Sequence, residues 1–256
     1  MVNSTISLVV TTYNSYEVLR NFFIWMLESY PLFDEVIIVD DCSSDESFLL
    51  IRDWVNKNDV ESKVLLITTP RNSGRPSVPR NMGVEKASMD VIVFLDIDDL
   101  IPLGYIKHIR SLKPVEIITC TKSRYKDTSH FDFRKMYDCK KVRYLTKLDI
   151  KSKNQITFSG TAVPTYVAKK YKFENCVLED WLYWRAISAN EDVSFVKYLL
   201  VPIGYFNKTT LSPPKLRQVK RVAQIIGWRG MPLYFLLHAR QRLEEFVVEL
   251  RGLNHL

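Results

Sequence analysis

Residues 90–100 read DVIVFLDIDDL and residues 35–41 read EVIIVDD, and these two stretches decide the fold. In each, a continuous run of apolar side chains ends in aspartates. Such runs, without polar alternation, are typical of strands buried on both faces of a parallel sheet. The two stretches therefore predict parallel strands whose carboxyl ends carry acidic side chains.

Around these two strands, the first hundred residues alternate between predicted strands and helices. Short β-rich runs predict strands at residues 6–10, 35–39, 64–67 and 90–95. Apolar residues recur at helical spacing before Pro31, and we expect further helices ending near Lys57 and spanning 81–87. Asn14 and Glu17 resemble a reciprocal helix cap. The alternation predicts an α/β fold with helices on both faces of the sheet.

The second half of the chain is less regular. We expect strands at residues 116–121 and 193–202, a helix at 177–189, and a strand or turn at 155–163. Residues 122–153 are polar, basic and aromatic with weak periodicity, so no element is predicted there.

The net charge of +7 is concentrated at the C-terminal end. From Lys215 onwards there are eight Lys or Arg residues against three Glu, so the remainder of the 256-residue chain is close to neutral. That balance argues against a nucleic-acid-binding protein, which would carry a basic face on its main domain. The same segment contains Trp228, Tyr234 and Phe235. We expect residues 213–256 to form a basic amphipathic helical tail that contacts an anionic membrane or packs on the domain.

Several features bear on the compartment. The cysteines are widely spread and form no CxxC pair, which favours reduced thiols in a cytosolic protein over a zinc site: Cys42, Cys120, Cys139 and Cys176. The first fifteen residues are typical of a first strand rather than a signal peptide. The sequence contains no run of about 18 apolar residues, so no transmembrane helix is predicted.

The acidic groups at the strand ends are candidates for a ligand site. Asp40-Asp41 and Asp96-x-Asp98-Asp99 each follow an apolar strand, and ligands of parallel α/β sheets bind at the carboxyl ends of the strands. Two aspartates separated by one residue can ligate Mn²⁺ or Mg²⁺ together with substrate phosphates, which makes a diphosphate a better leaving group. Aspartate is also common in turns and at helix N-caps. Two such groups at equivalent strand ends favour the ligand site.

Two common nucleotide-binding motifs are absent from the sequence. There is no GxxxxGK[ST] and no GxGxxG after the first strand, which disfavours P-loop and dinucleotide-binding proteins. One class of enzyme that could use such an acidic nucleotide site is a nucleotidyltransferase. That class should carry a Gly-rich basic loop after the first strand, and residues 11–17 (TTYNSYE) contain no Gly, Lys or Arg. A non-catalytic nucleotide-binding module is a second alternative, although it would be expected to have lost the metal-binding acids.

Four motifs, in order, resemble the inverting glycosyltransferases of family 2. They are VDDCSSD with TTYN before it, N-x-G followed by P-R-N-x-G, DIDD, and EDW, at residues 39–45, 72–83, 96–99 and 179–181. The resemblance is close over residues 5–100 and loose over 155–212. It implies a GT-A fold: a Rossmann-like, mostly parallel central sheet flanked by helices, with the C-terminal tail as a helical extension. The catalytic domain would span 1–212, with its nucleotide-sugar-binding half at 1–100 and its acceptor-binding half at 101–212.

The resemblance also implies which residues bind the nucleotide. The set is Thr11, Tyr13, Asp40, Asp41, Asn72, Arg80, Asp96 and Ile97. Tyr13 would stack on the base, and Asp40 would accept a hydrogen bond from a ring N–H, since an ionised carboxylate only accepts. Asp41 would bind alongside it or orient the loop. Arg80 would be a fixed cation in the pocket, or else part of a surface ion pair, and Asp96 would contact the ribose.

On the reacting side, the resemblance implies a metal ion and a base. Asp98 would ligate Mn²⁺ or Mg²⁺, with Asp99 behind it or facing the acceptor. Asp180, next to Glu179, would take the proton of the attacking hydroxyl, and attack opposite the leaving diphosphate inverts the anomeric centre. Without the resemblance, the Glu179-Asp180 pair predicts only a solvated helix start. Lys208 is a candidate for neutralising diphosphate charge.

Some positions depart from the family pattern. Cys42 stands where the family usually has Gly, Pro79 stands where it has Ala, and residues 205–212 (YFNKTTLS) leave a third metal ligand open. The expected donor is a nucleotide-sugar, with UDP favoured over GDP and dTDP. The expected acceptor is a saccharide or lipid-linked saccharide of bacterial surface-polysaccharide assembly, such as lipopolysaccharide or capsule, used at the cytoplasmic face of the inner membrane. Acceptor choice is expected to lie in residues 122–175.

Overall fold

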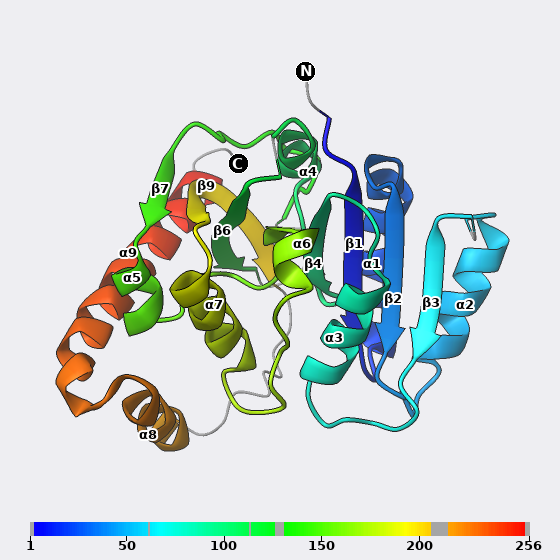
Figure 1. Cartoon of the computed structure of the whole chain (residues 1–256). Helices are drawn as coiled ribbons and strands as arrows, with labels where there is room; N and C mark the ends of the chain where they lie inside the picture. The colour runs from blue at the N-terminus through cyan, green and yellow to red at the C-terminus, as the bar shows by residue number, and fades with distance from the viewer. Residues whose placement is uncertain (1–2, 61, 113, 126–130, 206–214, 254–256) are drawn as a thin grey trace.

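The computed structural model describes the chain except for residues 1–2, 61, 113, 126–130, 206–214 and 254–256. Within this described part, nine strands form one sheet, in the order β3-β2-β1-β4-β8-β6-β9-β5 with β7 paired to β9 (Figure 1). The strands are β1 (Ile6–Thr12), β2 (Glu35–Asp40), β3 (Val64–Thr68), β4 (Val91–Asp96), β5 (Asp99–Leu100), β6 (Glu116–Arg124), β7 (Val142–Leu145), β8 (Ala162–Pro164) and β9 (Ser194–Tyr205).

The sheet is mostly parallel. β1 to β4, β6 and β9 run in one direction, and β5, β7 and β8 run in the opposite direction. The helices are α1 (Leu19–Ser29), α2 (Ser47–Lys57), α3 (Ser77–Lys86), α4 (Leu103–Arg110), α5 (Lys147–Ser152), α6 (Thr165–Ala168), α7 (Glu179–Asn190), α8 (Lys215–Ile226) and α9 (Met231–Leu253). Short 3₁₀ turns are η1 (Tyr16–Val18), η2 (Tyr30–Leu32) and η4 (Trp228–Gly230). The predicted α/β fold class is confirmed.

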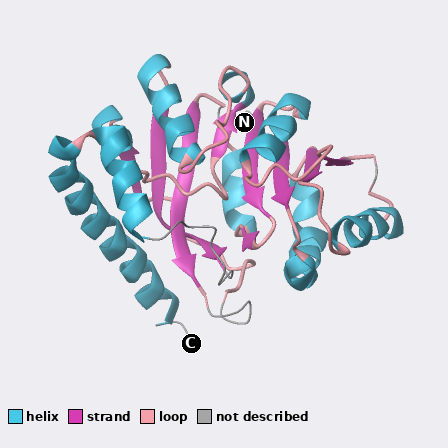
Figure 2. Cartoon of the chain, turned by 90° about the horizontal axis from the view of Figure 1, so that it is seen from below, coloured by secondary structure: helices cyan, strands magenta, loops and turns pink. Residues whose placement is uncertain are grey.

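Helices cover both faces of the sheet because successive strand residues point to opposite sides. Along β1, Leu8 and Val10 join a core cluster with α1, α2 and α4, whereas Val9 joins a second cluster with α3, α6 and α7. Figure 1 shows α3, α6 and α7 in front of the sheet. The long helix α9 lies at one end of the sheet (Figure 2), where it contacts α5, β6 and β9.

Most predicted elements of the first hundred residues are confirmed with shifted ends. Helix α3 begins at Ser77 rather than 81, because proline is tolerated at the first turn of a helix, where Pro79 lies. The predicted cap at Asn14 is wrong. Asn14 has a φ of +46°, and its Oδ1 accepts a hydrogen bond from the Ser44 N–H at 2.8 Å. Its side chain therefore joins two loops instead of capping a helix.

Beyond β4, the sequence does not predict β5, α4, β7, α5 or the short α6. Of residues 155–163, only Ala162 and Val163 lie in a strand, and Ser159-Gly160 form the turn that was the predicted alternative. Strand β6 runs on to Arg124 and β9 to Tyr205. Across the described ranges, we find no helix with both the length and the hydrophobicity needed to span a membrane.

Candidate active site at the carboxyl edge of the sheet

Three predicted residues meet at the carboxyl edge of neighbouring strands. In the sheet register, Thr11 of β1 lies opposite Asp96 of β4, and the next residue, Thr12, lies opposite Asp40 of β2. The Thr11 hydroxyl donates to Asp96 Oδ1 at 3.0 Å. Tyr13 follows directly and leaves 47 % of its surface exposed, so its ring is accessible to a ligand.

The carboxylate of Asp40 is buried and already accepts hydrogen bonds from the protein. The Ser43 N–H donates to Oδ2 at 2.8 Å and the Ser43 hydroxyl donates to Oδ1 at 2.5 Å. The Thr68 hydroxyl makes a longer contact of 3.4 Å with Oδ2. Each carboxylate oxygen has two lone pairs, so Asp40 is held rigidly and retains capacity for a further donor.

Asp41 organises the loop that carries Asn72. Its carboxylate accepts from the Ser73 N–H at 3.1 Å, the Ser73 hydroxyl at 2.8 Å and the Thr69 hydroxyl at 2.9 Å. The side-chain amide of Asn72 donates to Asp41 Oδ2 at 3.2 Å and to its backbone carbonyl at 3.1 Å. Both residues are thus used, in this structure, to shape residues 69–74 over the edge of the sheet.

Cys42, which stands where the family usually has Gly, has a backbone conformation that favours glycine. Cys42 has a φ of +56°, in the left-handed region, and its side chain is exposed. Glycine adopts this conformation without a steric cost, whereas a residue with a Cβ does not. The backbone here therefore keeps the shape that suits glycine, and the cysteine imposes strain on it.

Arg80 connects the edge of the sheet with the start of α7. It is 4 % exposed. Its Nη1 donates to Glu179 Oε1 at 2.8 Å, and its Nη2 donates to Asp96 at 3.1 and 3.3 Å. The guanidinium lies 3.4 Å from the centroid of the Phe158 ring. The cation is buried together with Glu179, whereas its other partner, Asp96, is partly exposed.

The charges of this cluster influence one another. Burial lowers the pKa of the Arg80 guanidinium, but the attraction of Asp96 and Glu179 more than offsets it, so its pKa is raised. Burial raises the pKa of Glu179, against the lowering effect of Arg80 and with a further increase from Asp180. A buried cation between two carboxylates is stabilised only while both partners remain in place.

Asp180 lies on the first turn of α7 and both of its oxygens are hydrogen-bonded. The side-chain amide of Asn154 donates to Oδ2 at 2.7 Å, and the N–H of Trp181 donates to Oδ1 at 2.8 Å. The residue before the pair, Leu178, has a φ of +64°. The side chain of Glu179 is 14 % exposed, so this is not the solvated helix start that the residues alone predict.

Of the three residues after β4, Ile97 and Asp99 are buried and Asp98 is half-buried. Ile97 is buried in the core beside α1 and α4, and it meets the edge only through its backbone, whose N–H donates to Thr11 O at 3.2 Å. Asp99 is 2 % exposed and accepts from the Ser159 hydroxyl at 2.5 Å. Burial raises the pKa of Asp99 to about 8, against the lowering effect of Lys122, and Asp98 and Asp96 raise it further.

The surroundings of Asp98 bear on the predicted metal site. Asp98 is half-buried between Asp96, which is engaged by Arg80, and Asp99, which is engaged by Ser159. Among the described residues, no group of three or more His, Cys, Asp or Glu is arranged to hold a metal. Mg²⁺ commonly takes one or two carboxylates plus substrate phosphates and water. Asp98 remains the metal ligand that the resemblance implies, and a metal ion there would depend on further ligands from the substrate or water.

Three residues near the predicted site were missed from the sequence. Ser159 links the strand end to Asp99, since the Asp96 N–H donates to its hydroxyl at 3.1 Å. Phe158 underlies the guanidinium and Asn154 binds Asp180. Only the Ser159-Gly160 turn left a signal in the sequence. Lys208 lies outside the described residues.

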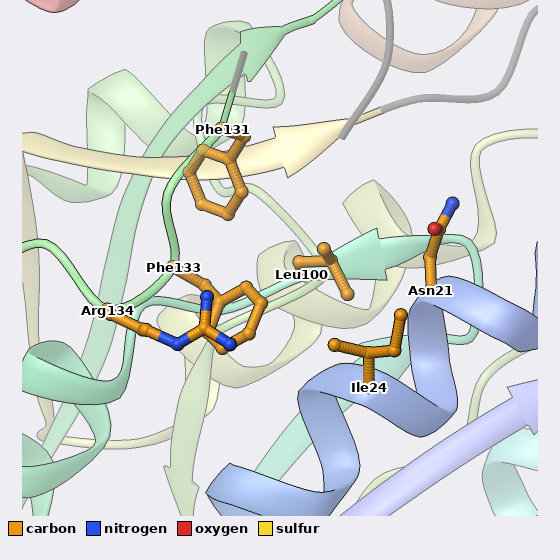
Figure 3. A pocket seen from close by; sticks show the side chains of 6 residues that line it. All are labelled: Asn21, Ile24, Leu100, Phe131, Phe133 and Arg134. Carbon is orange, nitrogen blue, oxygen red and sulfur yellow. The ribbon is translucent and has the colours of Figure 1, made fainter. Parts of the chain in front are cut away.

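A pocket on the α1 side of the sheet is separate from this set. It has a volume of about 170 Å³ (Figure 3) and is lined by Asn21, Ile24, Leu100, Phe131, Phe133 and Arg134. Arg134 is paired there with Glu28. None of the six lining residues belongs to the predicted site, so the pocket is not assigned to the nucleotide.

Comparison with known proteins bears on the family and the fold of the chain. The family described as Glycosyl transferase family 2 matches residues 7–163. An uncharacterized glycosyltransferase of Haemophilus influenzae is 29 % identical over 181 residues, which are 70 % of this chain and 70 % of that protein. The poly(ribitol-phosphate) beta-N-acetylglucosaminyltransferase TarS of Staphylococcus aureus is 34 % identical over 97 residues, which are 37 % of this chain but 16 % of TarS.

A solved structure supports the fold. The crystal structure of S. aureus TarS 1–349 in complex with UDP-GlcNAc superposes with a TM-score of 0.63 over 87 % of this chain and 65 % of that chain. The sequence identity in this superposition is 19 %, so the likeness bears on the fold alone. The chain spans less than two thirds of the length of TarS in both comparisons.

Proposed function

The chain belongs to glycosyl transferase family 2, and on that basis we propose that it transfers a sugar with inversion from a UDP-sugar to a saccharide or lipid-linked saccharide. The observation that carries the proposal is the Arg80 cluster. It joins Asp96, at the strand edge where nucleotides bind in such sheets, to Glu179, which precedes Asp180. A donor-binding edge and a candidate base are thereby held in one rigid unit.

In this proposal the nucleotide lies along the ends of β1, β2 and β4. The exposed ring of Tyr13 stacks on the base, and Asp40, fixed by Ser43, accepts the hydrogen bond from its ring N–H. Asp96 meets the ribose, with its position fixed by Arg80. Support for UDP comes from the structure of the TarS fragment, which was determined with UDP-GlcNAc.

The reacting end follows from the contacts of Asp180. Its carboxylate is oriented by Asn154 and by the N–H of Trp181, so it is preorganised to take the proton of an attacking acceptor hydroxyl. Attack from the side opposite the diphosphate gives inversion. Asp98 would hold Mn²⁺ or Mg²⁺, which neutralises the charge of the leaving diphosphate when bound. Glu179 keeps Arg80, and with it Asp96, in register with the base.

The acceptor and its location are inferred from the tail. Helix α9 exposes Phe235, Leu236 and Leu243, whose exposed fractions are 54, 66 and 63 %. Apolar side chains in a basic segment favour peripheral contact with an anionic membrane. We therefore propose a lipid-linked acceptor in surface-polysaccharide synthesis, used at the cytoplasmic face of the inner membrane. TarS, whose name describes transfer to poly(ribitol-phosphate), supports a polymeric acceptor of this kind.

The test is thermal stabilisation of the purified chain by UDP, GDP, dTDP and their sugars, each with and without Mn²⁺ or Mg²⁺. A ligand present at 100 times its Kd and bound only to the folded state adds about 2.7 kcal/mol. We expect metal-dependent stabilisation by a UDP compound, lost in Asp98→Ala and kept in Asp53→Ala, a carboxylate on α2 whose side chain is 66 % exposed. Absence of stabilisation by every nucleotide with metal would contradict the donor site.

The two alternatives make different products. A nucleotidyltransferase would release pyrophosphate from UTP and a sugar 1-phosphate, whereas the proposed enzyme releases UDP from the UDP-sugar. A non-catalytic module would be stabilised by the UDP-sugar but would release no UDP beyond the level of the Asp180→Asn variant.

A further inference from the structure

The C-terminal helices contact both segments that hold Asp180. One segment is the start of α7, where the Trp181 N–H donates to Asp180 Oδ1. The other follows α5, where the Asn154 amide donates to Asp180 Oδ2. Each of these two segments is packed or hydrogen-bonded against residues beyond 215.

The contact with the first segment is apolar. Trp181 is 1 % exposed and shares a buried cluster with Val222 and Ala223 of α8 and Met231 of α9. The Tyr234 ring lies at the edge of this cluster, with its centroid 6.4 Å from that of Trp181. The side chain directly after Asp180 is therefore enclosed by the tail rather than by the sheet.

The contact with the second segment is polar. The Lys153 ammonium, one residue before Asn154, donates to the side-chain oxygen of Gln241 on α9. The Trp181 indole N–H donates to the Ile150 carbonyl of α5 at 2.6 Å. Helices α5, α7 and α9 are thus joined into one unit around the two donors that orient Asp180.

A strained residue lies in the same unit. Leu178 has a φ of +64° and packs against the tail cluster. A left-handed conformation costs a residue with a Cβ about 1–2 kcal/mol, and it persists only where the surroundings determine it. Leu178 packs against the cluster that Trp181 forms with Val222, Ala223 and Met231, and α7 begins at the next residue.

We infer that α8 and α9 position the carboxylate of Asp180, so that the tail is a structural part of the active site and not only an attachment to other surfaces. The inference rests on the proposed function, in which Asp180 is the base. Because a displacement of about 1 Å at a reacting group can lower the rate on the order of 100-fold, small losses of packing around Trp181 affect turnover more than donor binding.

The test uses full-length variants in the tail helices α8 and α9. Met231→Ala removes packing from Trp181, and Gln241→Ala removes the partner of Lys153. Gln224→Ala is the matched control for Gln241→Ala because the Gln224 side chain is exposed on α8. UDP release from UDP-GlcNAc, with water as the acceptor, gives kcat and KM. Hydrogen exchange of the Trp181 amide reports on its bond to Asp180 whether or not UDP-GlcNAc is the donor.

We expect Met231→Ala and Gln241→Ala to lower kcat by about ten-fold with an unchanged KM, and to speed exchange of the Trp181 amide. Met231→Leu should restore both, and the Gln224→Ala control should match the wild type. Unchanged exchange and kcat in Met231→Ala and Gln241→Ala would overturn the inference. Asp180→Asn separates the two claims, since retained UDP release in that variant contradicts the base assignment and leaves the exchange result to decide on the tail.

Discussion

Arg80 Nη1 lies 2.8 Å from Glu179 Oε1, although 99 positions separate the two residues in the chain. The same guanidinium reaches Asp96 and stacks on Phe158. Arg80 belongs to the P-R-N-x-G motif that resembles a nucleotide-binding segment. Its ion pairs connect the end of β4 with the start of α7. Its position between two carboxylates makes the cluster dependent on all three charges.

Replacing Arg80 should destabilise the protein strongly. Arg80→Ala leaves Glu179 and Asp96 without their cation, and breaking a buried pair typically costs about 3–5 kcal/mol. Because the Asp96 side chain is 34 % exposed, we expect the lower end, about 3 kcal/mol, in urea unfolding. The control is Arg52→Ala, which removes an exposed pair with Asp53 and should cost less than about 1 kcal/mol. Equal losses in the two variants would contradict a structural role for the cluster.

Cys42→Gly should stabilise the fold. The φ of +56° at Cys42 costs a residue with a Cβ about 1–2 kcal/mol, and glycine removes this cost while adding about 0.5–1 kcal/mol of chain entropy to the unfolded state. We expect a net gain on the order of 0.5 kcal/mol in urea unfolding. Cys42→Ala keeps the Cβ and should show no such gain. A destabilised glycine variant would mean that the thiol makes contacts that outweigh the strain.

Much of the fold could be predicted because the parallel strands are buried on both faces. The runs ending at Asp40 and Asp96 contain no polar alternation, and both became central strands with their acids at one edge. Strand β7 carries no such pattern. It pairs only with β9 in the described chain, and its Tyr144 is 63 % exposed, so its existence depends on a partner more than fifty residues away.

Short elements and long-range polar contacts account for the parts of the fold and of the candidate site that could not be predicted. Helix α5 has six residues, too few for a helical period, although the capping box of Thr146 and Asp149 is a signal that the sequence does contain. The acids from Asp40 to Asp99 could be found because they follow strands, whereas Asp180 is indicated only by the resemblance to the family. The burial of Arg80 could not, since it depends on Glu179 and Phe158, which only the folded chain brings near.

Gly83 should not tolerate a side chain. A Cβ there would lie 2.3 Å from Val9 Cγ1, on the strand beneath α3. Overpacking of this kind costs about 1–3 kcal/mol, so Gly83→Ala should lose about that much despite its better helix propensity. In the double variant with Val9→Ala, the two losses should be clearly less than additive, which a double-mutant cycle measures. Additive losses would show that the two residues do not press on each other.

Asp99 should make stability fall as the pH rises. Its folded pKa is raised to about 8, above an ordinary value near 4, so between these two values the folded state holds a proton that the unfolded state has released. The contribution of Asp99 to the free energy of unfolding is therefore complete at low pH. It declines as the pH rises to about 8, by on the order of 1.4 kcal/mol for each pH unit. Asp99→Asn, which cannot ionise, should show a flatter profile in metal-free urea unfolding from pH 5 to 8. Asp34→Asn is the control of opposite sign, because Arg110 lowers the pKa of Asp34 and its contribution is lost only as the pH falls below about 4. A profile for Asp99→Asn as steep as that of the wild type would mean that Asp99 is ionised in the folded protein.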